Sequence, residues 1–220
     1  MKKKQAFAFF DFDGTLIPGD SIAAFVRYAR KRGFMPRRAF LRAMLAAAGY
    51  ILGLVSAADS KNAALRFRMG LSPADREALD RDFVRDCLLP RVYPQGKACL
   101  DFHRQSGRDT VLVTASTENY MRIIAEALGF SALLATPLNP DGTVGENCRG
   151  EEKPRRIREW LQQQDREADF AASFAYGDSK SDLPMLLLCG HRVQVNPKRA
   201  LRKAAPDMEK VCWNENDRTL

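Results

Sequence analysis

The sequence has few of the residues that zinc knuckles, redox pairs and imidazole-based catalysis require. It contains two histidines, His103 and His191, so catalysis by histidine and metal sites rich in histidine lack the necessary side chains. Its five cysteines are scattered and include no C-x-x-C pair, which argues against a zinc site, a dithiol redox site and a disulfide framework. Unpaired cysteines are typical of a reducing compartment. We therefore expect a cytoplasmic protein.

Long apolar segments are also lacking. After a basic start, only residues 6–10 are apolar before Asp11, which is too short for the apolar region of a signal peptide. The uncharged stretch from Ala43 to Val55 has 13 residues, whereas a membrane span needs about 20. We predict that this stretch forms a buried helix, and a helix that touches a membrane surface stays open as the alternative.

The chain does contain enough apolar residues for a full core, together with an excess of positive charge. It has 220 residues, of which 45% are hydrophobic, and a formal net charge of +8. This length indicates one large domain or one domain with a small insert, and the composition excludes intrinsic disorder. Positive charge favours anionic partners. The arginine-rich stretch 27–42 lacks interleaved aromatic residues and any nucleic-acid motif, so we expect a solvated face and no nucleic-acid partner.

Two patterns divide the chain. Residues 21–88 are predicted to form helices only, with Ser72 as an N-cap and Pro73 at the first helical position of one of them. Apolar, β-branched or aromatic runs predict strands elsewhere, at 6–12, 110–114, 132–137, 172–176 and, as the last strand, 192–195. Helical patterns separate these strands, and such alternation predicts an α/β fold with a parallel sheet covered on both faces.

Polar residues directly follow three of the predicted strands. The clusters are Asp11-Phe12-Asp13-Gly14-Thr15, Thr114-Ala115-Ser116, and Gly177-Asp178 through Asp182. Ligands of open parallel sheets bind beyond the carboxyl ends of the strands, so these clusters are expected to converge. Carboxylates that meet in one cleft repel each other unless a cation holds them, and ligation by oxygen alone favours Mg²⁺.

A phosphate group would fit between such a cation and hydrogen-bond donors. Thr114, the amides of the turn after it, and Lys153, which precedes a predicted helix, would supply those donors. A carboxylate nucleophile would yield an acyl phosphate, and a second carboxyl group would protonate the leaving oxygen and later activate water. Asp11 and Asp13 could divide these two roles.

The three polar clusters and Lys153, which lies between the second and the third cluster, form four motifs along the chain. In their types and order they resemble those of haloacid-dehalogenase-superfamily phosphatases, in particular the phosphoserine-phosphatase-like branch of subfamily IB. The resemblance covers nearly the whole chain. It implies a Rossmannoid parallel sheet formed by residues 1–17 and 94–220, and an inserted α-helical cap of the C1 type, which we call the helical cap, at residues 18–93.

The same resemblance implies roles for individual residues. Asp11 would be the nucleophile and Asp13 the general acid and base, while Lys153 would neutralise charge at the phosphoryl group. Thr114 and Ala115 would bind phosphate. The Mg²⁺ ligands would be Asp11, Asp178, Asp182 and the backbone carbonyl of Asp13.

The chain also departs from the branch. Phosphoserine phosphatases usually carry S-G-G where this chain has Thr114-Ala115-Ser116, and Gly where it has Pro154. Asp20 stands where they place a glutamate for the substrate ammonium, and Arg68 lies near the position of their carboxylate-binding arginine. Asp20 also fits a helix N-cap, and Arg68 also fits a solvated helix charge.

We therefore expect an enzyme that hydrolyses a small phosphomonoester with Mg²⁺ through an aspartyl phosphate. Resemblance to phosphoserine and histidinol-phosphate phosphatases favours an amine-bearing substrate. Three alternatives stay open: phosphoryl transfer to an alcohol, hydrolysis of a lysophospholipid phosphate, and a non-enzymatic protein that binds anionic lipid or RNA. The oligomeric state is left open.

Overall fold

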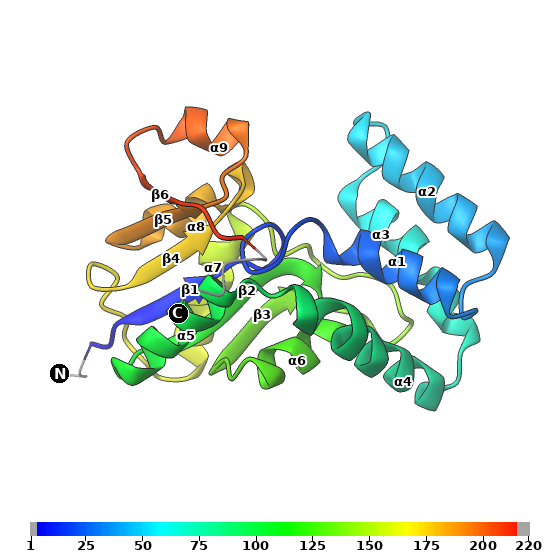
Figure 1. The fold of residues 1–220 in the computed structure, drawn as a ribbon, viewed down its shortest axis with the longest axis horizontal. Coiled ribbons are helices and arrows are strands. Elements are labelled where there is room, and N and C mark those ends of the chain that lie inside the picture. The colour runs from blue at the N-terminus through cyan, green and yellow to red at the C-terminus, as the bar shows by residue number, and fades with distance from the viewer. Residues whose placement is uncertain (1–3, 215–220) are drawn as a thin grey trace.

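A computed structural model of the protein describes residues 4–214 and has a six-stranded parallel sheet at its centre (Figure 1). The strand order is β3-β2-β1-β4-β5-β6, so β1 lies inside the sheet with a neighbour on each side. The strands are β1 (Phe7–Phe10), β2 (Asp109–Thr117), β3 (Ala132–Thr136), β4 (Phe174–Gly177), β5 (His191–Val195) and β6 (Glu209–Val211). The predicted α/β fold with a parallel sheet is confirmed.

Two layers of helices cover the sheet. They are α5 (Pro94–Gln105) and α6 (Glu118–Ala127) on one face, and α7 (Glu152–Gln163), α8 (Leu183–Leu188) and α9 (Arg199–Ala204) on the other. Successive side chains of a strand point to opposite faces. Accordingly, Phe10 packs in the core with α5 and α6, whereas Phe9 packs in the core with α7 and α8. All four residues of β1 are buried, which fixes the position of the loop that follows it.

The helical cap is inserted between β1 and β2. Its α-helices are α1 (Ser21–Lys31), α2 (Arg37–Ile51), α3 (Ala57–Leu65) and α4 (Pro73–Phe83). Shorter helical turns cover Arg66–Gly70, Val84–Leu88 and Leu89–Arg91. The predicted start of α4 is confirmed, because the Ser72 side chain accepts a hydrogen bond from the Asp75 amide and Pro73 is the first helical residue.

The two crossings between sheet and cap lie together. The guanidinium of Arg91 donates a 2.7 Å hydrogen bond to the carbonyl of Pro18. The amide of Tyr93 donates a 2.9 Å bond to the carbonyl of Leu16. The chain therefore leaves the sheet and returns to it at one place, next to the end of β1.

The sheet has one strand more than we predicted. The run at 192–195 is not the last strand, because α9 and β6 follow it and Glu209 of β6 pairs with Val193 of β5. The segment Glu209–Val211 is a three-residue edge strand with two exposed side chains. It is too short and too polar to show the apolar pattern of a buried strand.

The prediction of a buried helix at residues 43–55 is wrong. Ala43 is the only buried residue of α2. Leu45 is 73% exposed and Ile51 is 82% exposed. Figure 1 shows the reason, since α2 lies on the outside of the cap, where only α1 and α3 cover one side of it. Among residues 4–214, no helix combines the length and the apolar character that crossing a bilayer requires.

Candidate active site

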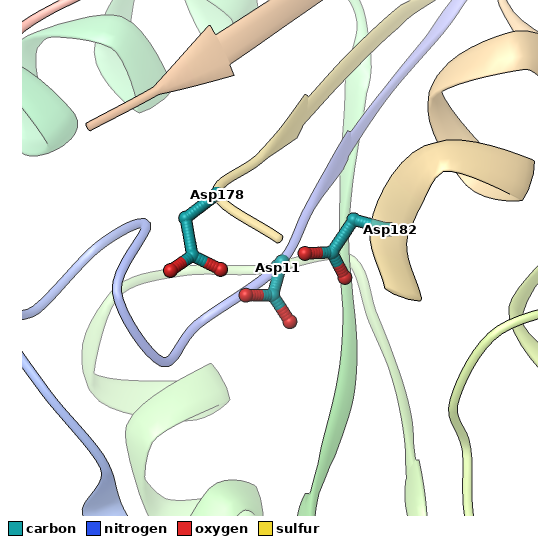
Figure 2. Close-up of side chains that lie close together, drawn as sticks. All are labelled: Asp11, Asp178 and Asp182. Atoms are coloured by element: carbon teal, nitrogen blue, oxygen red, sulfur yellow. The ribbon is translucent and has the colours of Figure 1, made fainter. Parts of the chain in front are cut away.

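Three carboxylates meet where β1 and β4 end. Asp11 follows β1, Asp178 follows β4, and Asp182 ends the short helical turn before α8. Figure 2 shows their carboxylates gathered at one point, although they come from distant parts of the sequence. One oxygen from each lies within 4.8 Å of the other two, and all three side chains are buried. An all-oxygen cluster of this kind can hold a hard divalent cation.

Two glycines allow the carboxylates to come this close. Gly14 has a φ of +83°, and a Cβ at this position would lie 2.1 Å from an oxygen of Asp178. A Cβ at Gly177 would lie 2.6 Å from the Cβ of Asp182. The first glycine is required by its backbone conformation and by its neighbour, the second by its neighbour alone. The close approach of an aspartate side chain thus explains why both positions are glycine.

Lys153 connects the carboxylates to a positive charge. Its ammonium donates to Asp11 at 2.6 Å and to Asp182 at 2.7 Å, and the side chain is only 1% exposed. Burial alone would lower the pKa of Lys153, but the two carboxylates raise it above its ordinary value. The lysine therefore stays charged, although it lies on the buried face of α7.

The Asp11 carboxylate has a raised pKa. Burial and the negative charge of Asp182 raise its pKa to about 8, against the opposing effect of Lys153. Thr15 donates a further hydrogen bond to Asp11 at 3.1 Å. A cation among the three carboxylates would favour their charged forms. The cluster of three carboxylates thus lacks compensating positive charge, which a bound divalent ion would supply.

Lys198 is a second cation at the site, and sequence reasoning missed it. Its ammonium lies 2.7 Å from an oxygen of Asp178, and its amide donates to the Asp178 carbonyl at 2.8 Å. Unlike Lys153, the Lys198 side chain is 64% exposed. The two lysines together carry less positive charge than the three carboxylates carry negative charge.

Asp13 points toward the cap and is held by hydroxyl groups. Ser21, the first residue of α1, donates to it from its amide at 2.7 Å and from its hydroxyl at 3.1 Å. Ser116 of β2 donates to the same carboxylate. The Tyr120 hydroxyl lies 3.1 Å from that of Ser21. Burial and the charge of Asp20 raise the pKa of Asp13 to about 6, which suits a general acid near neutral pH.

The predicted phosphate-binding residues lie beside these carboxylates, but they belong to β2 and not to a turn after it, because the strand continues to Thr117. The Thr114 side chain is fully buried, and its oxygen accepts a 3.0 Å hydrogen bond from the Ser116 amide. Ala115 and Ser116 line the cavity described below. The pairing of β2 with β3 is irregular between Val113 and Thr117, which marks a local distortion of the strand at these residues.

Of the two predicted substrate-binding residues, Asp20 and Arg68, only Asp20 lines the cavity. Asp20 lines the cavity and is also the N-cap of α1, where it accepts a 2.8 Å hydrogen bond from the Ala23 amide. Arg68 is not part of the cavity lining. It is buried and pairs with Asp80 through both of its terminal nitrogens, so it is not the solvated charge that we also considered.

Lys61 of α3 also lines the cavity, and sequence reasoning missed it. Its ammonium donates to the Ala115 carbonyl and, at 2.6 Å, to the side-chain oxygen of Asn147. Burial lowers the pKa of Lys61 to about 8, although the carboxylates of Asp13 and Asp20 oppose this shift. A cap lysine therefore reaches the irregular part of β2. The sequence carried no signal for this, because one lysine among solvated helix charges fits no motif.

A cavity of about 620 Å³ lies between the strand ends and the cap. Asp11, Asp178 and Lys153 line its sheet side, whereas helices α1, α2 and α3 form its cap side. Contacts between cap and sheet loops border it, including the bonds of Lys61, a bond from Arg149 to the Tyr50 hydroxyl, and a 2.7 Å bond from the Val144 amide to Asn62. The reacting groups are thus enclosed by the cap.

Comparison with known proteins agrees with this geometry. A sequence profile of the haloacid dehalogenase-like hydrolases matches residues 8–187. A probable phosphatase of Mycobacterium tuberculosis is 33% identical over 209 residues, which cover 90% of this chain and 71% of that protein. A histidinol-phosphatase of Neisseria meningitidis is 27% identical over 91% of this chain and 94% of its own length. A solved protein of unknown function from Bordetella pertussis has a TM-score of 0.84 at 26% identity, covering 95% of this chain and 99% of its own.

Proposed function

Because the chain belongs to the haloacid dehalogenase-like hydrolase family, we propose that it is a Mg²⁺-dependent phosphatase that hydrolyses a small phosphomonoester in the cytoplasm. The observation that carries the proposal is the buried cluster of Asp11, Asp178 and Asp182 with Lys153 bonded to two of them. Asp13 lies beside this cluster with a pKa suited to proton transfer. The phosphatase-named relative from Mycobacterium tuberculosis supports the same reaction class.

The residues present fit a magnesium ion. Asp11, Asp178 and Asp182 offer oxygen atoms within 4.8 Å of one another, and no histidine or cysteine belongs to the described group. The backbone carbonyl of Asp13 would complete the protein ligands. When bound, Mg²⁺ would neutralise the charge that develops on the oxygens of the transferred phosphoryl group.

In the first step, an oxygen of Asp11 attacks phosphorus. Lys153 favours the ionised form of Asp11 and stabilises negative charge at the phosphoryl oxygens. Asp13 donates its proton to the leaving oxygen, which departs as an alcohol while Asp11 becomes an aspartyl phosphate. The hydrogen bonds from Ser21 and Ser116 hold the Asp13 carboxyl in one orientation for this transfer.

In the second step, Asp13 is ionised and acts as a base. It takes a proton from a water molecule that attacks the phosphorus, which releases phosphate and regenerates Asp11. The amide of Ala115 and the hydroxyl of Thr114 would bind phosphoryl oxygens in both steps. Enclosure by the cap limits the access of further water.

For the leaving group, we propose an amine close to the phosphate. Asp20 lines the cavity, and a carboxylate there would attract an ammonium group. The match to a histidinol-phosphatase is in keeping with an amine-bearing substrate. Arg68 is bound to Asp80, so the contact we expected from it with a substrate carboxylate has no support in the geometry.

Phosphate release by the wild-type protein and by Asp11→Asn, with Mg²⁺ or with EDTA, tests the proposal. The panel would hold O-phosphoserine, histidinol phosphate, phosphoethanolamine, a sugar phosphate and ethyl phosphate. We expect Mg²⁺-dependent turnover that falls by about 10⁴-fold or more in Asp11→Asn, with an unchanged circular dichroism spectrum. Equal turnover by Asp11→Asn would contradict the nucleophile assignment, and no turnover of any member by the wild type would contradict the proposed function.

The role of Asp20 has its own test within the panel. Asp20→Asn keeps an N-cap side chain but removes the charge. We expect it to raise KM about tenfold for the amine-bearing members and to leave KM for ethyl phosphate nearly constant. An equal change in both KM values would contradict a contact with the substrate ammonium.

A further inference from the structure

The cap side of the cavity differs in character from its sheet side. Apart from Asp20, Tyr50, Ser60 and Lys61, the cap residues that line it are all apolar. We call the following six the tail slot: Ile22, Val26, Ala43, Met44, Ala47 and Ile51. They come from two neighbouring helices of the cap, α1 and α2, which also contact each other.

We propose that the substrate is an amphiphilic phosphomonoester whose apolar chain lies in the tail slot. This inference rests on the proposed function, and it specifies the part of the leaving group that lies beyond Asp20 and Lys61. The phosphate would bind at the carboxylates, an amine would lie near Asp20, and the chain would extend between α1 and α2. Ligand sites are commonly apolar with a few polar groups that fix orientation, and here the polar groups lie together at the sheet end.

The size of the lining residues supports a narrow chain rather than a bulky ring. Ala43 and Ala47 lie one helical turn apart on α2, so two small side chains lie together in the lining. Larger apolar side chains, among them Val26 and Met44, border this space. Val26 and Ala43 are already buried, so a chain in this position would cover mainly the half-buried Ile22 and Ala47 and the exposed Met44 and Ile51.

The slot also continues to the surface of the cap. Met44 is 40% exposed and Ile51 is 82% exposed, although both line the cavity. An apolar chain that passes between them would cover these side chains. The cavity therefore has room for a long chain, because the end of that chain can reach the surface of the cap.

The first test is the dependence of kcat/KM on chain length, measured with n-alkyl phosphates from ethyl to decyl below their aggregation concentrations. Each added methylene should raise kcat/KM by about fourfold until the slot is filled, which corresponds to about 0.8 kcal/mol per buried methylene. A flat or falling series would overturn the inference. Hydrolysis of the amine-bearing panel members without hydrolysis of any alkyl phosphate would also overturn the inference. If neither the panel members nor the alkyl phosphates were hydrolysed above the Asp11→Asn background, the proposed function would fail instead.

The second test fills the slot. Ala47→Trp should lower the ratio of kcat/KM for decyl phosphate to that for ethyl phosphate at least tenfold, because the indole would occupy the space of the chain. The control is Ala48→Trp, the same substitution at an exposed neighbour outside the cavity lining, which should keep the wild-type ratio. Equal ratios in the two variants would contradict the inference.

A third pair of variants keeps the inference testable if Ala47→Trp does not fold. Ile51→Ser removes an exposed lining residue and should lower the decyl-to-ethyl ratio about threefold or more. Leu45→Ser removes an equally exposed apolar residue of the same helix that does not line the cavity, and should leave the ratio unchanged. The opposite ranking would show that chain length acts through the outer face of α2, and would overturn the assignment to the slot.

Discussion

The sheet and the helical cap place their side chains under very different constraints. All four residues of β1 are buried, whereas α2 buries only Ala43 of its 15 residues. A buried central strand cannot shift without disturbing both faces of the sheet, and it carries Asp11 at its end. An outer helix that is packed on one side can be changed at many positions with little cost. The groups that we propose to react are thus held by the buried part, and the groups that we propose to contact the leaving group come from the part that is packed less tightly.

Each part also contains a buried ion pair, and the two pairs differ in use. Lys153 joins Asp11 to Asp182 at the cavity. Arg68 pairs with Asp80 outside the cavity lining, and its guanidinium lies over the ring of Phe25. Asp80 also accepts a hydrogen bond from the side-chain amide of Asn119 on α6. The pair in the sheet organises reacting groups, whereas the pair in the cap connects helices to one another and to α6.

Variants that break each ion pair should show which pair supports catalysis and which only stabilises the fold. These variants have the largest expected effects on unfolding free energy and kcat. Lys153→Met and Arg68→Met each leave a buried carboxylate without its cation, so each should lower the free energy of unfolding by about 3–5 kcal/mol. Only Lys153→Met should also lower kcat by about 10²–10³-fold, because its ammonium contacts Asp11, the proposed nucleophile. Urea unfolding in EDTA and phosphate release would measure the two effects.

The control for this comparison is Lys198→Met. Its side chain is 64% exposed, so water can take the place of the ammonium beside Asp178, which is itself buried. The loss of this ion pair should therefore cost less than the loss of either buried cation, about 1–2 kcal/mol. If Arg68→Met lowered kcat as much as Lys153→Met did, the division between a reacting pair and a structural pair would be wrong.

Two glycines with the same backbone angle sharpen the contrast further. Gly14 at the end of β1 and Gly33 in the cap both have a φ of +83°, but an added Cβ would meet Asp178 only at Gly14 and would meet nothing within 4 Å at Gly33. Gly33→Ala should cost about 1 kcal/mol for its left-handed backbone. Gly14→Ala should cost about 1–3 kcal/mol more and should lower kcat about tenfold, because the carboxylate must move. Equal unfolding free energies in the two variants would show that the close approach to Asp178 is unimportant.

The smallest expected effect is a pH dependence of the unfolding free energy, caused by a histidine packed against the sheet. His103 on α5 is fully buried, with its ring 2.8 Å from the Tyr176 hydroxyl. Burial lowers its pKa from 6.5 to about 4, and the positive charge of Arg108 acts in the same direction. As the pH falls below 6.5, the unfolded chain therefore binds a proton that the folded protein does not. The free energy of unfolding should fall between pH 6.5 and pH 4 for this reason.

His103→Gln isolates that contribution, because it keeps a polar side chain but cannot titrate. The difference in unfolding free energy between the wild type and this variant should shrink or reverse as the pH falls from 7 to 4. Thermal unfolding in matched buffers would measure it. A difference that stays constant over this range would mean that the histidine binds a proton equally well in both states.

The sequence predicted the reacting groups far better than their surroundings. Asp11, Asp13, Asp178 and Asp182 could be placed together because each follows or lies near a recognisable strand end, and parallel strands bring their carboxyl ends to one edge. Lys153 was found from its position between motifs. These residues depend on topology, which the order of strands and helices already indicates.

The contacts that the sequence did not predict cross between cap and sheet. Ser21 looks like an ordinary helix start, and Lys61 like an ordinary helix charge, until the fold brings them to Asp13 and to Ala115. The exposure of α2 was missed for a related reason. An apolar run indicates a helix, but burial depends on how many neighbours pack against it, and that number is set by the tertiary fold.

One consequence of the paired crossings concerns evolution. The entry and exit of the cap are tied by the bonds from Arg91 to Pro18 and from Tyr93 to Leu16. A segment whose two ends are already held together adds little loop-closure cost when its length changes. Insertions, deletions and replacements between residues 18 and 91 would therefore leave the register of β1 and β2 intact. Descendants of one hydrolytic scaffold could acquire new substrates by exchanging a whole module at this single junction.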